Sequence, residues 1–182
     1  MPRLITTHTL SDVTHIARNM RPRDREEIFA TRYGEDTDKL AHDTLSTGPF
    51  QWCAVADDGE PIAVIGAHPR WPNVWSAWAF GTARWPEAIG LLTRHVRRFM
   101  LPALYNSGAA RVDAMSLATH EDARKWLEFL GAKPKEKLDN WGKNGEDFVN
   151  YVWTRETTKG VIDKIDQRRT TQSNSNVSAE LR

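Results

Sequence analysis

The stretch from Ala109 to Ala132 constrains the fold more than any other part of the chain. It reads as a strand over Arg111–Leu117, a tight turn, and a helix that opens after the N-cap Thr119. The apolar residues of this helix recur at the spacing i, i+3, i+4, i+7 of one buried face: Ala123, Trp126, Leu127 and Leu130. Gly131 follows, where helices commonly end in a left-handed residue. A strand followed directly by such a helix indicates a sheet that is covered by helices.

The rest of the chain alternates helical and strand patterns around this unit. Three helical patterns precede a hairpin signal at Asp57-Asp58-Gly59-Glu60, and a long helical pattern begins at Pro86. We predict a turn over 68–73, and Pro102 should bend or end the long helix. Strands are expected over Arg3–Thr7, Gln51–Ala56, Pro61–Ala67, Val74–Phe80, Lys135–Trp141 and Asp147–Trp153. This order predicts an α+β sandwich, with helices flanking a mixed central sheet.

Length and composition limit the classes of protein to consider. The 182 residues suit one domain, which we place at 1–155, followed by a polar tail at 156–182 that is predicted to be disordered alone or ordered only against a partner. A net charge of +1 gives no general attraction to nucleic acid or to an anionic membrane. No apolar run is long enough for a membrane span. The single cysteine, Cys53, is expected to be a buried thiol.

Four of the eight tryptophans lie close together, at positions 71, 75, 78 and 85. One interpretation is core packing of a strand and its flanks, which we favour. The other is an exposed contact surface, because aromatic side chains make good anchors in interfaces.

The element order resembles that of the GNAT acyl-CoA N-acyltransferases over about Leu4 to Thr154. The most specific part is HEDARKWLEFLGA at His120–Ala132, which is similar to the last helix of that family. The combination of NMRPRDREEI, AFGT and ARKWLEFLGA is also similar to a GNAT-like family of tailed bacteriophages. Members of that family are commonly internal virion proteins of short-tailed phages or proteins of unknown function.

The resemblance implies a site for the CoA diphosphate between the strand at Val74–Phe80 and the helix that begins at Pro86. The candidate cofactor-binding residues are Phe80, Gly81, Thr82 and Arg84. The chain departs from the family pattern here, because the loop has a single glycine and a bulky Trp85. Pro86 lacks an N–H donor, and Glu87 brings negative charge toward the diphosphate. The loop is therefore either a weak anion site or a plain connection, and the latter is favoured.

The resemblance also implies an acid and a base, and the sequence offers few candidates for either. Leu127 stands where many GNAT enzymes have a tyrosine acid. His68, Asp113 and His120 are the candidate catalytic residues. We expect His120 to be a polar surface residue more often than a catalyst. HEDAR carries Arg124 where a zinc motif needs its second histidine, so no metal site is expected.

Three functions remain open. The first is a phage GNAT-fold protein that acts in the particle or its assembly, with its acetyl-CoA site degenerate. The second is an active, divergent N-acetyltransferase that uses acetyl-CoA to modify a host or phage protein. The third is an adaptor that binds a host protein through its aromatic face. The expected partners are therefore other virion proteins or a host protein, in an assembly that can be oligomeric, and the expected location is the virion or the host cytoplasm.

Overall fold

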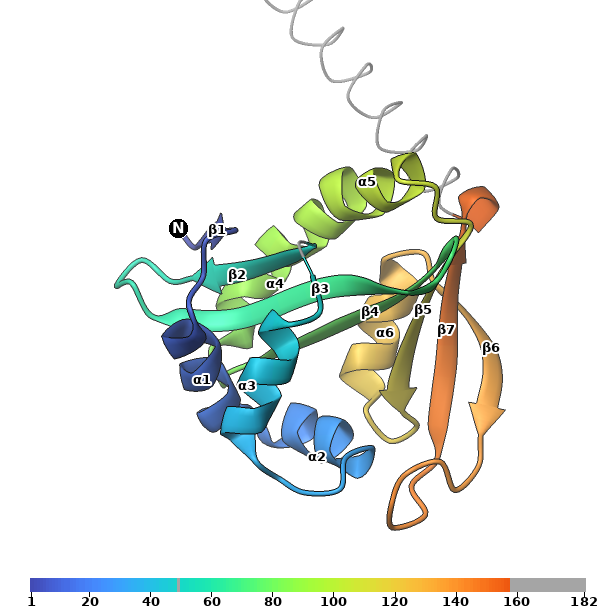
Figure 1. The fold of residues 1–182 in the computed structure, drawn as a ribbon, viewed down its shortest axis with the longest axis horizontal. Helices are drawn as coiled ribbons and strands as arrows, with labels where there is room; N and C mark the ends of the chain where they lie inside the picture. Colours follow the sequence, from blue (N-terminus) through green and yellow to red (C-terminus); the bar gives the residue numbers. More distant parts are fainter. Residues whose placement is uncertain (49, 158–182) are drawn as a thin grey trace, which may run out of the picture.

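The computed structural model describes residues 1–48 and 50–157. Within them, seven strands form one mixed sheet in the order β1-β2-β3-β4-β5-β7-β6. Helices α1 to α3 cover one face of the sheet, and the long helical segment and α6 cover the other (Figure 1). This is the α+β architecture predicted from the order of the elements. The predicted tail lies outside the described residues beyond Thr157.

The elements have the following bounds: β1 (Arg3–Ile5), α1 (Leu10–Arg18), α2 (Pro22–Ala30), α3 (Thr37–Leu45), β2 (Gln51–Val55), β3 (Pro61–Trp71), β4 (Val74–Gly81), α4 (Trp85–His95), η1 (Val96–Met100), α5 (Leu101–Asn106), β5 (Arg111–Leu117), α6 (Glu121–Phe129), β6 (Lys133–Leu138) and β7 (Phe148–Thr154). The strand–helix unit is confirmed, although the N-cap of α6 is His120 and not Thr119. Its backbone N–H donates to the carbonyl of Leu117, which tightens the turn by one residue.

The turn predicted over 68–73 is wrong, because β3 continues to Trp71. His68 pairs with Ser76 and Pro69 with Trp75, and the turn itself is confined to Pro72 and Asn73. β2 stops pairing with β3 at Gly66, so Pro69 lies on an open edge, where a strand tolerates proline. The extended β3 carries polar side chains past the end of the hydrophobic core.

Pro102 does not end the long helix, because the chain passes through it to Asn106. A π-helical turn, η1, precedes the proline, and the Leu101 N–H donates to the Val96 carbonyl five residues back. Proline lacks the next N–H and its ring collides with the carbonyl four residues earlier. The wider turn shifts the hydrogen-bond pattern at this point, which lets α4, η1 and α5 form one continuous segment.

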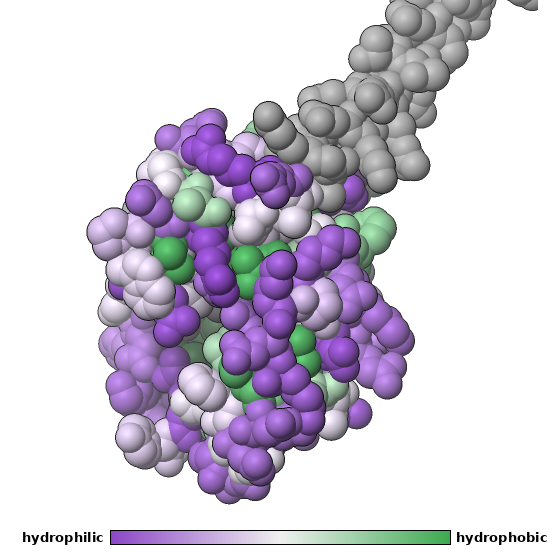
Figure 2. Space-filling model, turned by 90° about the vertical axis from the view of Figure 1, so that its right-hand side faces the viewer, coloured by the Kyte–Doolittle hydropathy of each residue, from purple (hydrophilic) through white to green (hydrophobic). Residues whose placement is uncertain are grey.

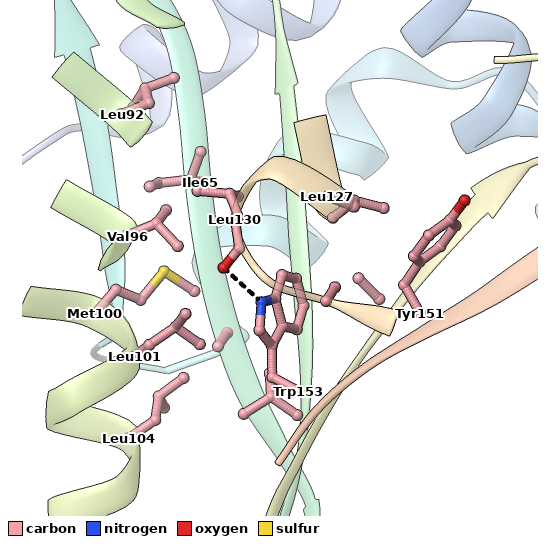
Figure 3. Packing of buried hydrophobic residues seen from close by; sticks show 14 of the residues in the cluster. Ile65, Leu92, Val96, Met100, Leu101, Leu104, Leu127, Leu130, Tyr151 and Trp153 are labelled. Carbon is pink, nitrogen blue, oxygen red and sulfur yellow. Dashed lines mark hydrogen bonds between the residues drawn. The ribbon is translucent and has the colours of Figure 1, made fainter. Parts of the chain in front are cut away.

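The larger hydrophobic cluster lies between the sheet and the long helical segment (Figure 3). Leu130 and Trp153 face Val96, Met100 and Leu101 in it, and the Trp153 Nε1–H donates to the Leu130 carbonyl at 3.2 Å. The predicted core face of α6 is confirmed for Leu127 and Leu130, which are buried, while Trp126 is partly buried.

A second cluster fills the space under α1 and α3 and contains Cys53, which is fully buried. Burial raises the pKa of the Cys53 thiol to about 12, so the residue stays protonated and is a core thiol, as predicted. The tryptophan group divides: Trp85 is buried, Trp75 and Trp78 pack partly buried against the core, and Trp71 is 58% exposed. In the described part of the chain, no helix has the length and apolar character needed to cross a membrane.

The face of the molecule over β6 is largely hydrophilic (Figure 2). β6 is an edge strand with the sequence KPKEKL, and all of its residues except Leu138 are exposed. Lysines and a proline on an edge strand discourage pairing with a second sheet. This edge is therefore poorly suited to pairing with another strand.

Candidate functional site

β4 and β5 are neighbours in the sheet, but they separate along most of their length. Their parallel register consists of three pairs, Val74 with Arg111, Trp75 with Val112, and Ser76 with Asp113. Beyond these pairs, Ala77–Gly81 and Ala114–Leu117 share no ladder among the described residues. The two strands thus form a fork in the middle of the sheet, with two hollows beside it.

The first hollow, which we call the fork cavity, lies between the fork, the long helical segment and α6. It has a volume of about 80 Å³ and a mainly apolar lining that includes Ile65, Met100, Leu101, Leu127 and Trp153. This volume holds a few water-sized groups and is far smaller than a typical ligand pocket.

Trp85 and Trp126 form one wall of the fork cavity. Their rings meet edge to face, with centroids 5.3 Å apart, and the Trp126 Nε1–H donates to the Thr93 hydroxyl at 2.8 Å. The hydrogen bond joins α6 to α4. The gap between these two helices, which opens onto the fork, is therefore bridged by direct side-chain contacts.

The end of β4 is closed by the junction between α1 and α2. The Gly81 N–H donates to the Asp24 carboxylate at 2.9 Å, and the Gly81 carbonyl accepts the Arg21 N–H at 2.9 Å. The Arg21 guanidinium lies 4.5 Å from the centre of the Trp85 ring and pairs with Asp24 at 2.8 Å. A Cβ atom at Gly81 would lie 2.6 Å from the Trp85 ring, so only glycine allows this close approach.

The loop between β4 and α4 has few free donors. The Thr82 N–H donates to the Ile62 carbonyl, the Arg84 N–H to the Thr82 hydroxyl and the Trp85 N–H to the Thr82 carbonyl, at 2.9 to 3.2 Å. The Arg84 side chain contacts three carboxylates at 2.6 to 2.7 Å: Asp58, Glu60 and Glu87. These contacts lower the pKa values of the Glu60 and Glu87 carboxyls, and the pKa of Asp58 is lowered first by the Glu60 N–H and then by Arg84.

The predicted cofactor-binding residues are thus adjacent, but they are already engaged with the protein. Phe80 is a core residue, Gly81 and Thr82 have bonded amides, and Arg84 is neutralised. A diphosphate at this helix N-terminus needs free N–H groups and an uncompensated positive charge. The residues present therefore do not fit the diphosphate of CoA.

A buried polar cluster lies at the mouth of the fork cavity. The Glu27 Oε2 atom accepts bonds from the Ser116 hydroxyl and the Leu117 N–H, both at 2.7 Å, and lies 3.1 Å from His120 Nδ1. His120 Nε2 lies 3.8 Å from Asp24, and burial raises the pKa of Asp24 while Arg21 and the Gly81 amide oppose that rise. The prediction that His120 is a surface residue is wrong, because its side chain is 3% exposed.

Asp24 and Glu27 are not among the candidates predicted from the sequence, because acidic residues near the start of a helix are ordinarily explained by the helix dipole. Their spacing of three residues places both on one face of α2. One of them contacts the end of β4 and the other contacts β5. The spacing was the available signal, but it does not tell which strands lie opposite.

The other two catalytic candidates, Asp113 and His68, both lie opposite Ser76 in the sheet, but no hydrogen bond or ion pair joins them in the described part of the chain. Asp113 is 7% exposed and bound by Arg111, at 2.6 to 3.0 Å, and by the Asn150 amide at 3.1 Å. His68 lies on the extended part of β3 and lines the second hollow. Burial and the neighbouring Arg70 lower the pKa of His68. His68, Asp113 and His120 therefore do not form one constellation.

The second hollow, which we call the open groove, lies on the α2 and α3 side of the sheet and has a volume of about 430 Å³. Its lining includes His68 and Arg70 from β3, Trp78 from β4, and Trp141 from the connection between β6 and β7. Trp141 is 54% exposed. The groove and the fork cavity meet at the fork, where they share Glu27, Ala77, Trp78, Ala79 and Met115.

The overall fold recurs in solved structures. An acetyltransferase of the GNAT family from Bacillus anthracis is 10% identical with a TM-score of 0.64, covering 85% of this chain and 95% of that one. The chain has the GNAT acetyltransferase fold. An N-acetyltransferase from Staphylococcus aureus Mu50 is 14% identical with a TM-score of 0.67, covering 85% of this chain and 98% of that one.

A third GNAT-type structure, the ribosomal-protein-S18-alanine N-acetyltransferase from Escherichia coli, is 15% identical with a TM-score of 0.61 and covers 85% and 94% of the two chains. No family model matches the sequence. No curated protein matches it either. These likenesses therefore establish the GNAT fold, and the predicted resemblance to the bacteriophage branch stays a prediction.

Proposed function

We propose that this chain is a GNAT-fold binding protein that does not hold acyl-CoA in the manner of the family. The observation that carries the proposal is the closed end of β4, where Asp24, Arg21 and Trp85 surround Gly81. An extended CoA arm in the fork needs that backbone and a loop with free donors, and both are bonded within the protein. Fold alone does not imply the reaction of the family.

The sequence resemblance suggests where such a protein acts. We place it in a bacteriophage particle or in its assembly, with other virion proteins or a host protein as partners. Its location is then the virion or the host cytoplasm. Mass spectrometry of purified phage particles tests this part of the proposal, and absence of the chain from the particles contradicts a structural role there.

Calorimetry with acetyl-CoA tests the closed site. We expect no measurable heat and no shift of the melting temperature, because a ligand that binds the folded state must stabilise it. A Kd tighter than about 100 μM, which corresponds to about −5.5 kcal/mol, overturns the proposal. The Trp85→Ala variant enlarges the fork cavity and Trp71→Ala does not. Comparing the two variants therefore shows whether the Trp85 indole helps to exclude acetyl-CoA from the fork.

An active, divergent N-acetyltransferase that uses acetyl-CoA is the second candidate. The observation that favours it is the junction of the two hollows at Glu27, because a transferase needs its two substrates to meet. The Glu27 carboxylate, fixed through one oxygen by three contacts, is in a suitable place for a base. Release of free thiol from acetyl-CoA in the presence of host or phage proteins supports this candidate, provided that Glu27→Gln abolishes it.

A further inference from the structure

The open groove has one positive charge that no carboxylate neutralises. Within residues 1–48 and 50–157, Arg70 makes no ion pair, and the contact of its guanidinium is the Trp71 ring at 5.4 Å. The other charged side chains of the groove are engaged. Arg32 pairs with Asp43 at 2.7 Å, and Glu27 is bound by Ser116, Leu117 and His120.

Two polar side chains near Arg70 also have no hydrogen-bond partner in the described part of the chain. His68 Nδ1 is buried and unpartnered. Ser76 pairs with His68 across β3 and β4, and both residues line the groove with Arg70. The register of β3 shifts at Arg70, between Pro69 and Trp71, and both His68 and Arg70 line the groove. A guanidinium, a hydroxyl and an imidazole thus lie together at one end of the groove.

Apolar side chains line the groove farther across the sheet. The groove crosses four strands, with His68 on β3, Trp78 on β4, Met115 on β5 and Phe148 on β7. Strands lie about 4.8 Å apart, so the groove is at least roughly 14 Å long. An extended peptide advances about 3.3 Å per residue, so four residues, about 13 Å, cover most of that length. The half-exposed Trp141 at the rim offers an aromatic surface for one of their side chains.

We propose that the open groove binds a short extended peptide segment of a partner protein, with an acidic side chain on Arg70, Ser76 and His68. An apolar residue about three positions away lies against Trp141. A single carboxylate matches the single uncompensated charge, and the nearby Glu27 and Asp43 disfavour a more highly charged phosphate. This proposal specifies the kind of partner that the proposed binding protein recognises. It rests on the proposed function in one respect, that the ligand is part of a protein.

Four synthetic tetrapeptides test the proposal. Two are acetyl-Glu-Ala-Ala-Phe-amide and acetyl-Phe-Ala-Ala-Glu-amide, which cover both directions of the chain, and two carry Gln in place of Glu. Nuclear magnetic resonance titration of the full chain measures their Kd values. We expect one Glu peptide to bind at least tenfold more tightly than its Gln counterpart, which corresponds to about 1.4 kcal/mol.

Two arginine variants give the matched comparison. Arg70→Gln should abolish the preference for Glu, and Arg98→Gln, which removes an exposed charge on the other face of the sheet, should leave it unchanged. Both sites are exposed, so both variants should keep the wild-type melting temperature.

Three results overturn the inference. They are no binding of either Glu peptide up to about 10 mM, equal Kd values for the Glu and Gln peptides, and an Arg70→Gln variant that keeps the preference. Inorganic phosphate that shifts the same signals at lower concentration than the peptides also overturns it, in favour of a phosphate site. Acetyl-CoA calorimetry is independent, so peptide binding together with acetyl-CoA binding contradicts the proposed function and leaves this inference intact.

Discussion

The fork cavity and the open groove share five side chains, yet they are built differently. The polar groups at the mouth of the fork cavity bind one another, and its interior is apolar and small. The open groove is larger; in the described part of the chain, Arg70 has no ion pair there, and the side chains of His68 and Ser76 have no hydrogen-bond partner. The difference teaches that the GNAT sheet can close one of its two hollows with its own side chains while leaving the other available for a ligand.

The largest expected effect tests whether the wall of the fork cavity is structural. Trp85→Ala removes a buried indole that contacts Gly81, Arg21 and Trp126, and we expect a loss of about 3–5 kcal/mol in the free energy of unfolding. Urea denaturation measures it. Trp71→Ala, at a 58% exposed site, should change the free energy by no more than about 0.5 kcal/mol, and equal losses in the two variants contradict the comparison.

The next effect concerns the residue that belongs to both hollows. Glu27→Ala leaves the Leu117 N–H and the Ser116 hydroxyl without their acceptor, which should cost about 2–4 kcal/mol. The adjacent Glu26 is exposed and contacts Arg23 at 3.5 Å, so Glu26→Ala should cost no more than about 0.5 kcal/mol. Chemical denaturation of both variants measures the difference. A loss for Glu27→Ala as small as that for Glu26→Ala contradicts a stabilising role of the polar cluster around Glu27.

A smaller effect is expected at the bridge between α4 and α6. Thr93→Val keeps the side-chain shape and removes the acceptor of the Trp126 Nε1–H, so we expect a loss of about 1 kcal/mol. Thr119→Val, at an exposed site before α6, is the control and should be close to neutral. If Thr93→Val melts at the wild-type temperature, the bridge does not contribute to closing the fork.

The smallest effect is a dependence on pH at the loop before α4. Arg84 lowers the pKa values of Asp58, Glu60 and Glu87, so its contribution to stability is present above their usual pKa values of about 4 and is lost as the pH falls below them. Arg84→Gln should therefore melt below the wild type at pH 7, and the two melting temperatures should converge progressively as the pH falls below about 4. A difference that is constant with pH rules out this ion cluster as its cause.

Much of the fold was predictable because its local signals agree with its tertiary packing. The stripe of α6, the proline at the start of α4 and the hairpin turn at Asp57–Glu60 each specify an element that the structure confirms. The extension of β3 through Pro69 was not predictable, because it depends on where β2 stops pairing. The π turn before Pro102 likewise depends on how the long helical segment packs on the sheet.

The site was less predictable than the fold, since its groups come from distant parts of the sequence. The sequence of the loop from Gly81 to Glu87 was enough to predict that it has few N–H donors and that Glu87 brings negative charge close to it. Its closure, however, involves Asp24, which is 57 residues away from Gly81. The burial of His120 likewise depends on Glu27, 93 residues earlier. No local pattern identifies such pairs.

The fork divides the sheet into two antiparallel halves, β1 to β4 on one side and β5 to β7 on the other, joined by only three residue pairs in the described chain. At the open end, one turn of α2 ties the halves together, with Asp24 bound to the last residue of β4 and Glu27 to the last residue of β5. Residues three apart on a helix lie about 5–6 Å from each other. The opening of the fork is thus limited by a fixed helical spacing, and any molecule wide enough to part the strands must first break at least one of these two bonds.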